Sequence, residues 1–505
     1  MTLWKNVTLL AVLIAIAVTG NYLLDEASAA DSSNIYIDEE GGAEYTISGG
    51  IKPSARVTGW DGIHSDVTIK DSITVNGRTY SVKSISADAF REKDITSLVL
   101  PNSDNSIDIY NNAFSGCTKL TTVSLGTSVV ELWDNIFKDC TALKTFTSTN
   151  LSSIGLNTFA GCSSLCEINL NNGLKTIGES AFRNCTGLIK MSLPDSVTNI
   201  GSFAFSGCTS LTEVDLSGKL QSVSTSLFEN CSSLKSIHIP GSVNSFGSRS
   251  FKDCASLTSI IFEEGVDNIY GYELFLNCSF ETVLLPASVS QLNLGSNMSR
   301  QTMWPTTLSA ISVAESNPVF SSENGILFTK DKSLLLLCPS GKTGSITVDD
   351  NIDAYAFYNS SLEHLVLSDG ATSIGDYAFA NSALIDVIWT KTPDTVGTNV
   401  FYNCTKLNSI TLPADLSRIY DGLFYNCTSL VLTELPESVQ YIGANAFRGC
   451  VHVNPTSLPE NLGNVGSFAF NNAGIESVSL GISNEVVIGG GGGGVGFFFF
   501  FVFVL

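Results

Sequence analysis

The sequence has little charge, and most of that charge is negative. Only 15% of the 505 residues are Asp, Glu, Lys or Arg, and 48 acidic against 26 basic residues give a formal charge of −22. No cluster of Lys and Arg offsets this excess locally. Because nucleic acids and anionic headgroups are negative too, we expect no nucleic-acid partner, and membrane association only through a terminal anchor.

Groups that could do chemistry are also scarce. The four histidines are scattered without H-x-x-x-H spacing or an evident carboxylate partner, and the chain has no P-loop and no supported G-x-S-x-G elbow. The sequence therefore predicts a protein that is not an enzyme and that needs no cofactor. The histidines are His64, His238, His364 and His452.

No segment at either end makes a convincing membrane-spanning helix. Residues 1–29 combine Lys5, an apolar stretch and the small residues Ala27 to Ala29, which predicts a signal peptide and export. Asp25 and Glu26 leave an uncleaved anchor as the alternative. At the other end, 489–505 form a low-complexity Gly/Phe tail too short in its apolar part to cross a bilayer.

What the chain does have is a repeat. A phenylalanine followed three residues later by cysteine recurs every 22 to 24 residues, which indicates units that bury their apolar faces on one another. Between Phe275 and Phe357 the motif lapses for 82 residues. The eleven pairs are Phe114/Cys117, Phe137/Cys140, Phe159/Cys162, Phe182/Cys185, Phe205/Cys208, Phe228/Cys231, Phe251/Cys254, Phe275/Cys278, Phe401/Cys404, Phe424/Cys427 and Phe447/Cys450.

Each repeat follows the pattern L-x-x-[IV]-x-L-P-x-S-V-x-x-I-G-x-x-A-F-x-x-C. The alternating first part predicts a short strand, V-x-x-I-G a second short strand, and A-F-x-x-C a single helical turn or a tight corner. The chain thus reads as a repeat solenoid of about sixteen turns.

This pattern resembles the BspA-like, or Treponema pallidum type, leucine-rich repeats of surface proteins. The resemblance covers roughly Ser81 to Ile488. It implies a right-handed, strand-rich superhelix, a leading cap and an insert near Pro318 to Lys332. The predicted segments are 1–29 signal peptide, 30–80 cap, 81–278 repeats, 279–356 irregular insert with a hairpin, 357–488 repeats and 489–505 tail.

Thirteen cysteines in an exported chain would ordinarily suggest disulfides. Eleven occupy the same repeat position, however, and Ser360 and Ser382 replace cysteine at two equivalent sites. We therefore favour a ladder of buried thiols over bridges between neighbouring repeats, which remain the alternative. A metal site is not expected, since one thiol per repeat does not assemble four ligands.

The remaining surface of interest is the exposed side of the first strand in each repeat. Stacking should align these side chains into one stripe, on the concave face by resemblance to leucine-rich-repeat proteins. They either bind a partner or simply keep the sheet soluble. The candidate binding residues are Glu167, Asn169, Lys190, Ser192, Glu213, Asp215, Ser236, His238, His364, Asp386, Ser409 and Thr411.

Several Asn-Cys-[ST] corners also match the N-glycosylation pattern, although the consensus sequence of the repeat explains them equally well. The sequence and the resemblance together predict a secreted or cell-surface, monomeric protein that adheres to host proteins, matrix or other cells. A receptor or sensor ectodomain and a carbohydrate-binding surface protein are the alternatives. The corner asparagines are Asn184, Asn230, Asn277, Asn403 and Asn426.

Overall fold

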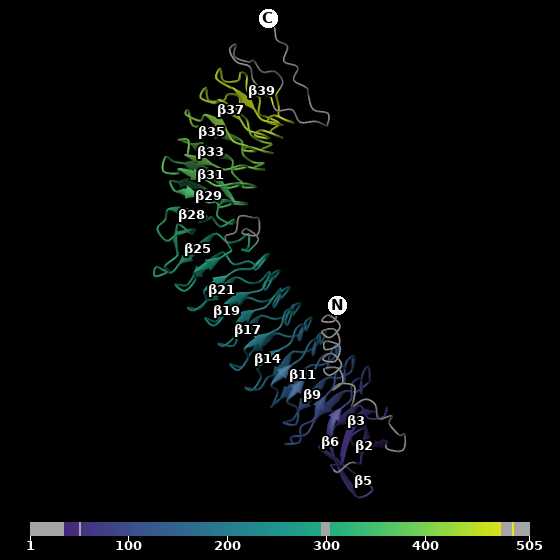
Figure 1. Ribbon diagram of the computed structural model, residues 1–505. Coiled ribbons are helices and arrows are strands. Elements are labelled where there is room, and N and C mark those ends of the chain that lie inside the picture. Colours follow the sequence, from purple (N-terminus) through teal and green to yellow (C-terminus); the bar gives the residue numbers. More distant parts are fainter. Residues whose placement is uncertain (1–34, 50–51, 294–302, 476–486, 489–505) are drawn as a thin grey trace, which may run out of the picture.

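The computed structural model describes residues 35–49, 52–293, 303–475 and 487–488. Over these residues the chain winds into an elongated arc of about 18 stacked turns, spaced about 23 residues apart (Figure 1). The predicted leucine-rich-repeat solenoid is therefore confirmed. The expected signal peptide and Gly/Phe tail lie outside the described residues.

One strand per turn forms what we call the first ladder, from the L-x-x-[IV]-x-L part of the repeat. Neighbouring strands pair in parallel one repeat apart, as Thr145 does with Glu167. Side chains alternate strictly: in β19, Ser236 and His238 are exposed while Ile237 and Ile239 are buried. The strands are β4 (Asp66–Thr68), β7 (Ser97–Val99), β9 (Thr122–Leu125), β11 (Thr145–Ser148), β13 (Glu167–Asn169), β15 (Lys190–Ser192), β17 (Glu213–Asp215), β19 (Ser236–Ile239), β21 (Ser259–Phe262), β23 (Thr282–Leu285), β25 (Ala310–Val313), β29 (Gly344–Val348), β31 (Leu362–Leu367), β33 (Asp386–Trp389) and β35 (Ser409–Thr411).

A second ladder comes from the V-x-x-I-G part, and most of its strands are two residues long. They also pair in parallel, as Ile154 does with Ile177. These strands are β8 (Asp108–Ile109), β10 (Glu131–Leu132), β12 (Ser153–Ile154), β14 (Thr176–Ile177), β16 (Asn199–Ile200), β18 (Ser222–Val223), β20 (Ser245–Phe246), β22 (Asn268–Ile269), β24 (Gln291–Leu292), β30 (Asn351–Ile352), β32 (Ser373–Ile374), β34 (Thr395–Val396), β36 (Arg418–Ile419), β37 (Tyr441–Ile442), β38 (Asn464–Val465) and β39 (Val487–Ile488).

The A-F-x-x-C corner is a pair of tight turns, so of the two predicted alternatives the tight corner is confirmed and the helical turn is wrong. Each corner has a residue with positive φ two positions before the phenylalanine and another two positions after it, such as Asn112 (59°) and Gly116 (73°) around Phe114. A right-handed helix needs consecutive residues near φ −63°, so these two positions prevent one from starting. The described residues contain no helix.

The corner phenylalanines stack in two continuous columns inside the solenoid. Successive ring centroids lie 4.9–5.6 Å apart from Phe90 to Trp304, and 4.8–5.7 Å apart from Phe357 to Phe470. Phe90, Trp304 and Phe470 fill the aromatic position in turns without a Phe-x-x-Cys pair. The array is accordingly longer than the sixteen turns that the motif indicates.

The cysteines form a ladder of free, buried thiols beside this column. All thirteen are unbridged, so the disulfide alternative is excluded for this structure. Each of the eleven repeat thiols donates to the carbonyl oxygen of the preceding turn's aromatic residue, with Sγ–O distances of 2.8–3.2 Å. Burial raises the pKa of Cys208 and Cys450 to about 12, so both stay protonated.

The N-terminal segment pairs differently from the repeats. Strands β1 (Ile35–Ile37), β2 (Ala43–Ser48) and β3 (Ser54–Trp60) form an antiparallel meander, and β5 (Ser72–Val75) makes a hairpin with β6 (Arg78–Ile85). β6 then pairs in parallel with both β3 and β8, so it joins this segment to the second ladder. The first edge of the stack is thereby covered.

A three-stranded antiparallel meander divides the solenoid into two arrays. It consists of β26 (Phe320–Glu323), β27 (Ile326–Thr329) and β28 (Leu334–Leu337), and β28 joins the second ladder beside β30. Leu327 and Leu337 pack into the core of residues 81–313, the N-terminal array, whereas Phe328 and Leu335 pack into that of residues 344–475, the C-terminal array. The meander is therefore a shared wall between two cores.

Candidate functional site

The candidate residues all lie on strands of the first ladder and point away from the core. Ten of the twelve are exposed, and His364 and Asp386 are half-buried. The meander and the neighbouring turns separate them into two groups, one on β13 to β19 and one on β31 to β35. The predicted stripe is thus present as geometry, but in two sections.

The section on the N-terminal array is charged. Lys190 and Glu213 lie opposite each other on β15 and β17, with Nζ and Oε2 2.5 Å apart, and Ser192 pairs with Asp215 beside them. The hydrogen bond to Glu213 raises the pKa of Lys190. Glu167 accepts a weak hydrogen bond of 3.4 Å from Asn169 on the same strand. On β19, Ser236 and His238 occupy the same two outward positions as Glu213 and Asp215 on β17.

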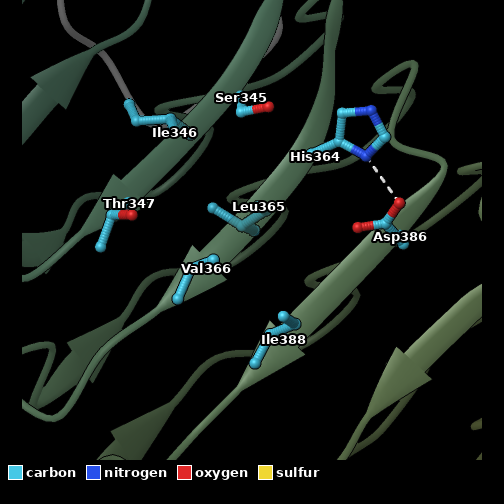
Figure 2. Close-up of a pocket in the computed structure, with 8 residues that line it drawn as sticks. All are labelled: Ser345, Ile346, Thr347, His364, Leu365, Val366, Asp386 and Ile388. Carbon is cyan, nitrogen blue, oxygen red and sulfur yellow. Dashed lines mark hydrogen bonds and ion pairs between the residues drawn. The ribbon is translucent and has the colours of Figure 1, made fainter.

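The section on the C-terminal array surrounds a shallow hollow of about 260 Å³ (Figure 2). His364 on β31 lies across from Asp386 on β33, with Nδ1 and Oδ2 2.6 Å apart. Ser409 follows in the same row on β35, with Thr411 beside it. The sequence analysis found no carboxylate near any histidine; that statement was wrong, because Asp386 is 22 residues away in the chain and becomes adjacent only when the turns stack. His64 likewise contacts Asp61, at 2.5 Å.

Ser345 extends this row on the other side of His364, giving three residue types that some hydrolases use. The register is Ser345, His364, Asp386 on three neighbouring strands. In Figure 2 the Ser345 hydroxyl is not joined to the imidazole, and Ser345 makes no hydrogen bond to His364 in the described structure. A nucleophile and its base must be within hydrogen-bonding reach, so this row does not form a triad.

Part of this surface is apolar. The repeat pattern places Ile261 and Ile388 at outward positions of the stripe, but it did not identify Leu284. Ile261, Leu284 and Ile388 occupy the second outward position of their strands and are 44%, 58% and 46% exposed. At that position most other strands carry Ser, Thr, Asn or Asp. Leu284 could have been found as the fifth residue of L-x-x-I-x-L, but it lies within the lapse between Phe275 and Phe357, where the repeat is hard to align. Ile261 and Leu284 lie on the successive strands β21 and β23, whereas Ile388 lies on β33 in the other array.

The corner asparagines have a conformational role. Asn184, Asn230, Asn277, Asn403 and Asn426 all have positive φ, between 57° and 62°, and glycine or aspartate takes the same place in other turns. Asn tolerates this region better than most residues. Moreover, Asn403 Nδ2 donates to Asn381 Oδ1 and Asn426 Nδ2 to Asn403 Oδ1, at 2.6 and 2.5 Å. The Asn-Cys-[ST] pattern therefore follows from the turn.

In residues 35–49, 52–293, 303–475 and 487–488, no three His, Cys, Asp or Glu side chains are grouped so as to hold a metal ion. In the same part of the chain, no helix has the length and apolar character to cross a bilayer.

Comparison with known proteins gives one family. The model described as "BspA type Leucine rich repeat region (6 copies)" matches residues 83–199, 175–301 and 350–476. No curated protein matches.

Several solved structures of bacterial leucine-rich repeat proteins are similar to this chain. A leucine-rich repeat protein from Bacteroides ovatus is 20% identical over 90% of each chain, with a TM-score of 0.40. A leucine rich cell surface protein from Faecalibacterium prausnitzii is 20% identical over 92% of this chain and 97% of its own, with a TM-score of 0.33. The T. pallidum leucine rich repeat protein is 24% identical over 44% of this chain and 91% of its own, with a TM-score of 0.32.

Proposed function

Because the chain belongs to the BspA-type leucine-rich-repeat family, we propose that it is an exported, non-catalytic adhesion protein. It is secreted or displayed at a cell surface, and it attaches to host proteins, extracellular matrix or other cells. The binding surface is the outward face of the first ladder. The partners are proteins.

The observation that carries this proposal is the distribution of side chains along that face. Ile261 and Leu284 lie before the meander and Ile388 after it, near the middle of the arc. Toward the N-terminal end the same columns carry Glu213, Asp215 and Lys190. Between Leu284 and Ile388 the same position carries Ser312, Thr347 and Val366, so the middle of the face is mixed, with Ile261 and Leu284 as its apolar pair. In protein interfaces a few such residues within a polar surround supply most of the binding free energy.

The scaffold suits this role because it is already ordered. Backbone groups of the first ladder are hydrogen-bonded to neighbouring turns, as in the β9, β11 and β13 strands. Little conformational entropy is lost when such a sheet meets a partner, and contacts spread along many turns add up. None of the outward residues on the described first-ladder strands is Phe, Tyr or Trp, which favours a protein partner over a stacked sugar.

The test is a pair of matched substitutions. The probes are fibronectin, laminin, collagen and cultured epithelial cells. Binding of the purified chain to each of them is measured. Leu284→Ser should weaken binding to the responding probe by roughly 30-fold, the effect expected of an interface hot spot. Val99→Ser is the control, because Val99 occupies the equivalent position on β7 and is 42% exposed. It should change affinity less than about threefold.

A second pair tests the charged section. Glu213→Lys with Asp215→Lys should lower the association rate and change its salt dependence, since charges at an interface rim act mainly on association. If all probes fail to bind, the adhesion proposal is wrong. If a probe binds but neither Leu284→Ser nor the charge reversal has any effect, binding occurs elsewhere on the molecule.

A further inference from the structure

A row of aromatic rings and one arginine runs along the outside of the corners of the C-terminal array. Tyr355 and Tyr377 stack with centroids 5.1 Å apart, Tyr377 meets Tyr402 edge-on at 5.9 Å, and Tyr402 stacks on Tyr425 at 5.0 Å. The guanidinium of Arg448 lies 5.3 Å from the Tyr425 ring and 5.6 Å from Phe468. We call these six residues the corner band. They are half-buried or exposed, and they cross six successive turns.

The band is not needed to hold the turns together. The N-terminal array stacks more turns on the same internal aromatic column without it, carrying mostly Asn, Ser, Ala and charged residues at the two equivalent corner positions. Two separate cation–π pairs lie at corners there, Arg183 over Phe203 at 5.6 Å and Arg249 over Tyr272 at 5.8 Å, and they do not join into a row. The equivalent N-terminal residues include Asn112, Ser115, Asn135, Lys138, Asn157, Ala160, Ser180, Ser226 and Glu229.

The band also carries a backbone cost. Tyr355, Tyr377 and Phe468 have φ of 58°, 54° and 58°, a region that bulky side chains rarely adopt. In the N-terminal array Phe203 and Arg249 adopt it at the same position, at 60° and 61°. Asn157, Asn399 and Asn445 fill the same position elsewhere with less strain. Strained residues that packing does not require point to a function of the surface they form.

The rings do not form a platform for sugars. The planes of Tyr355 and Tyr377 are 7° apart, and those of Tyr402 and Tyr425 are 25° apart, so these faces are turned toward one another along the stack. In the described structure Arg448 has no carboxylate partner; its nearest polar contact is Asn445 Oδ1 at 3.3 Å. The band therefore offers ring edges and an arginine that is not neutralised.

Side chains of opposite charge lie near the two ends of the band, Asp376 at one end and Arg448 at the other. Asp421, which has the position of Asp376 in the turn of Tyr425, lies 3.9 Å from Arg418. Asp376, exposed next to Tyr377, lies near the beginning of the band and raises the pKa of Tyr355 along with burial, the largest cause, and Tyr377. Arg448 lies near its end. The midpoint between them falls between the turns of Tyr402 and Tyr425. A two-fold axis through that midpoint would bring the ends of two copies together in reverse order.

We propose that the corner band is a self-association surface, through which two copies of this chain pack antiparallel. Around the axis, Tyr402 of one copy faces Tyr425 of the other, Asp376 faces Arg448, and Tyr355 faces Phe468. Each contact occurs twice, as an isologous interface requires. Tyr and Arg are also enriched in protein interfaces. This dimer replaces the monomer that the sequence suggests.

The dimer is expected to be weak. Six turns at a spacing of roughly 4.8 Å give a band about 25 Å long and one residue wide. Such a band buries less area than the roughly 800 Å² per partner of a standard interface. A weak contact of this kind becomes effective when many copies are held on one surface, because the local concentration is high. It is separate from the first ladder and can fail independently of the adhesion proposal.

The experiment is analytical ultracentrifugation of the purified chain over a wide concentration range. It compares the parent chain with two single charge reversals and with the double variant that combines them. The parent chain should show a concentration-dependent dimer. Arg448→Asp and Asp376→Arg should each weaken association at least tenfold, and the double variant should recover most of the loss. Arg183→Asp is the control, as Arg183 has the same corner position in the N-terminal array, and it should have no effect.

Folding must be monitored, because Asp376 also accepts hydrogen bonds from the Thr398 backbone N–H and hydroxyl. Circular dichroism and thermal midpoints serve for this. A parent chain that stays monomeric at the highest concentration overturns the proposal. A dimer that is insensitive to Arg448→Asp, or a double variant no better than the worse single, does so as well.

Discussion

The two arrays have the same interior and different exteriors. Both contain a continuous aromatic column and a row of thiols bonded to backbone carbonyls, although serine replaces cysteine at two turns of the C-terminal array. Outside, the N-terminal array has a charged first-ladder face and mostly Asn, Ser and charged residues at its corners. The C-terminal array has a hollow with a His–Asp pair and a band of tyrosines. Positions that stacking constrains are repeated, and positions free of that constraint have diverged.

This comparison separates packing residues from candidate functional ones without any alignment. A residue found at the same position in both arrays serves the solenoid. Leu284, Ile388, His364, Tyr377 and Arg448 differ from most of their equivalents, which makes them candidates for a role other than packing.

The largest loss of stability is expected from substitutions in the aromatic columns, and these test whether the two cores unfold independently. Phe182→Ala removes a ring stacked on Phe159 and Phe205, with centroids 5.1 and 5.3 Å away, and should cost about 3–5 kcal/mol. Hydrogen exchange measured by mass spectrometry should show lost protection in the N-terminal array only. Phe424→Ala is the matched change in the other array and should give the reverse pattern. Equal loss in both arrays would mean that the meander couples them into one cooperative unit.

A smaller effect is expected where the arrays differ inside. Ser360 replaces a repeat cysteine, is 2% exposed, and its hydroxyl has no hydrogen-bond partner. Ser360→Cys should therefore stabilise the C-terminal array by about 1–2 kcal/mol, because the weaker thiol donor costs less to bury. The matched change Cys208→Ser in the N-terminal array should destabilise. Urea denaturation measures both, and destabilisation by Ser360→Cys would show that the site is too small for sulfur.

The smallest perturbation is chemical labelling of thiols in the native protein. Cys166, in the N-terminal array, is exposed, and the other twelve cysteines are buried. Burial raises the pKa of nine of the eleven repeat thiols, as for Cys208 at about 12, so at pH 8 these nine are both inaccessible and protonated. Cys117 and Cys404 are protected by their burial alone. Iodoacetamide should add one label per native chain and thirteen after denaturation, as counted by intact mass. Rapid native labelling in the C-terminal array would contradict the buried ladder.

Much of the fold follows from local pattern. The period of the Phe-x-x-Cys pair gives the solenoid, and alternation within L-x-x-[IV]-x-L gives the first ladder with its outward residues. The corner was harder, since A-F-x-x-C is compatible with a helical turn until the two positive-φ positions are known. The lapse after Phe275 hid Trp304, which continues the column because tryptophan can stack where phenylalanine does.

The sequence by itself determined that the chain repeats, which side chains of each repeat face inward, and that catalytic groups are scarce. These properties depend on residues close together in the chain. The tertiary structure alone decided that Asp386 meets His364, that Leu284 is exposed on the same face as Ile388, and that Tyr355 to Phe468 form a single row. Those contacts join residues one repeat or more apart, so they exist only after the turns have stacked in register.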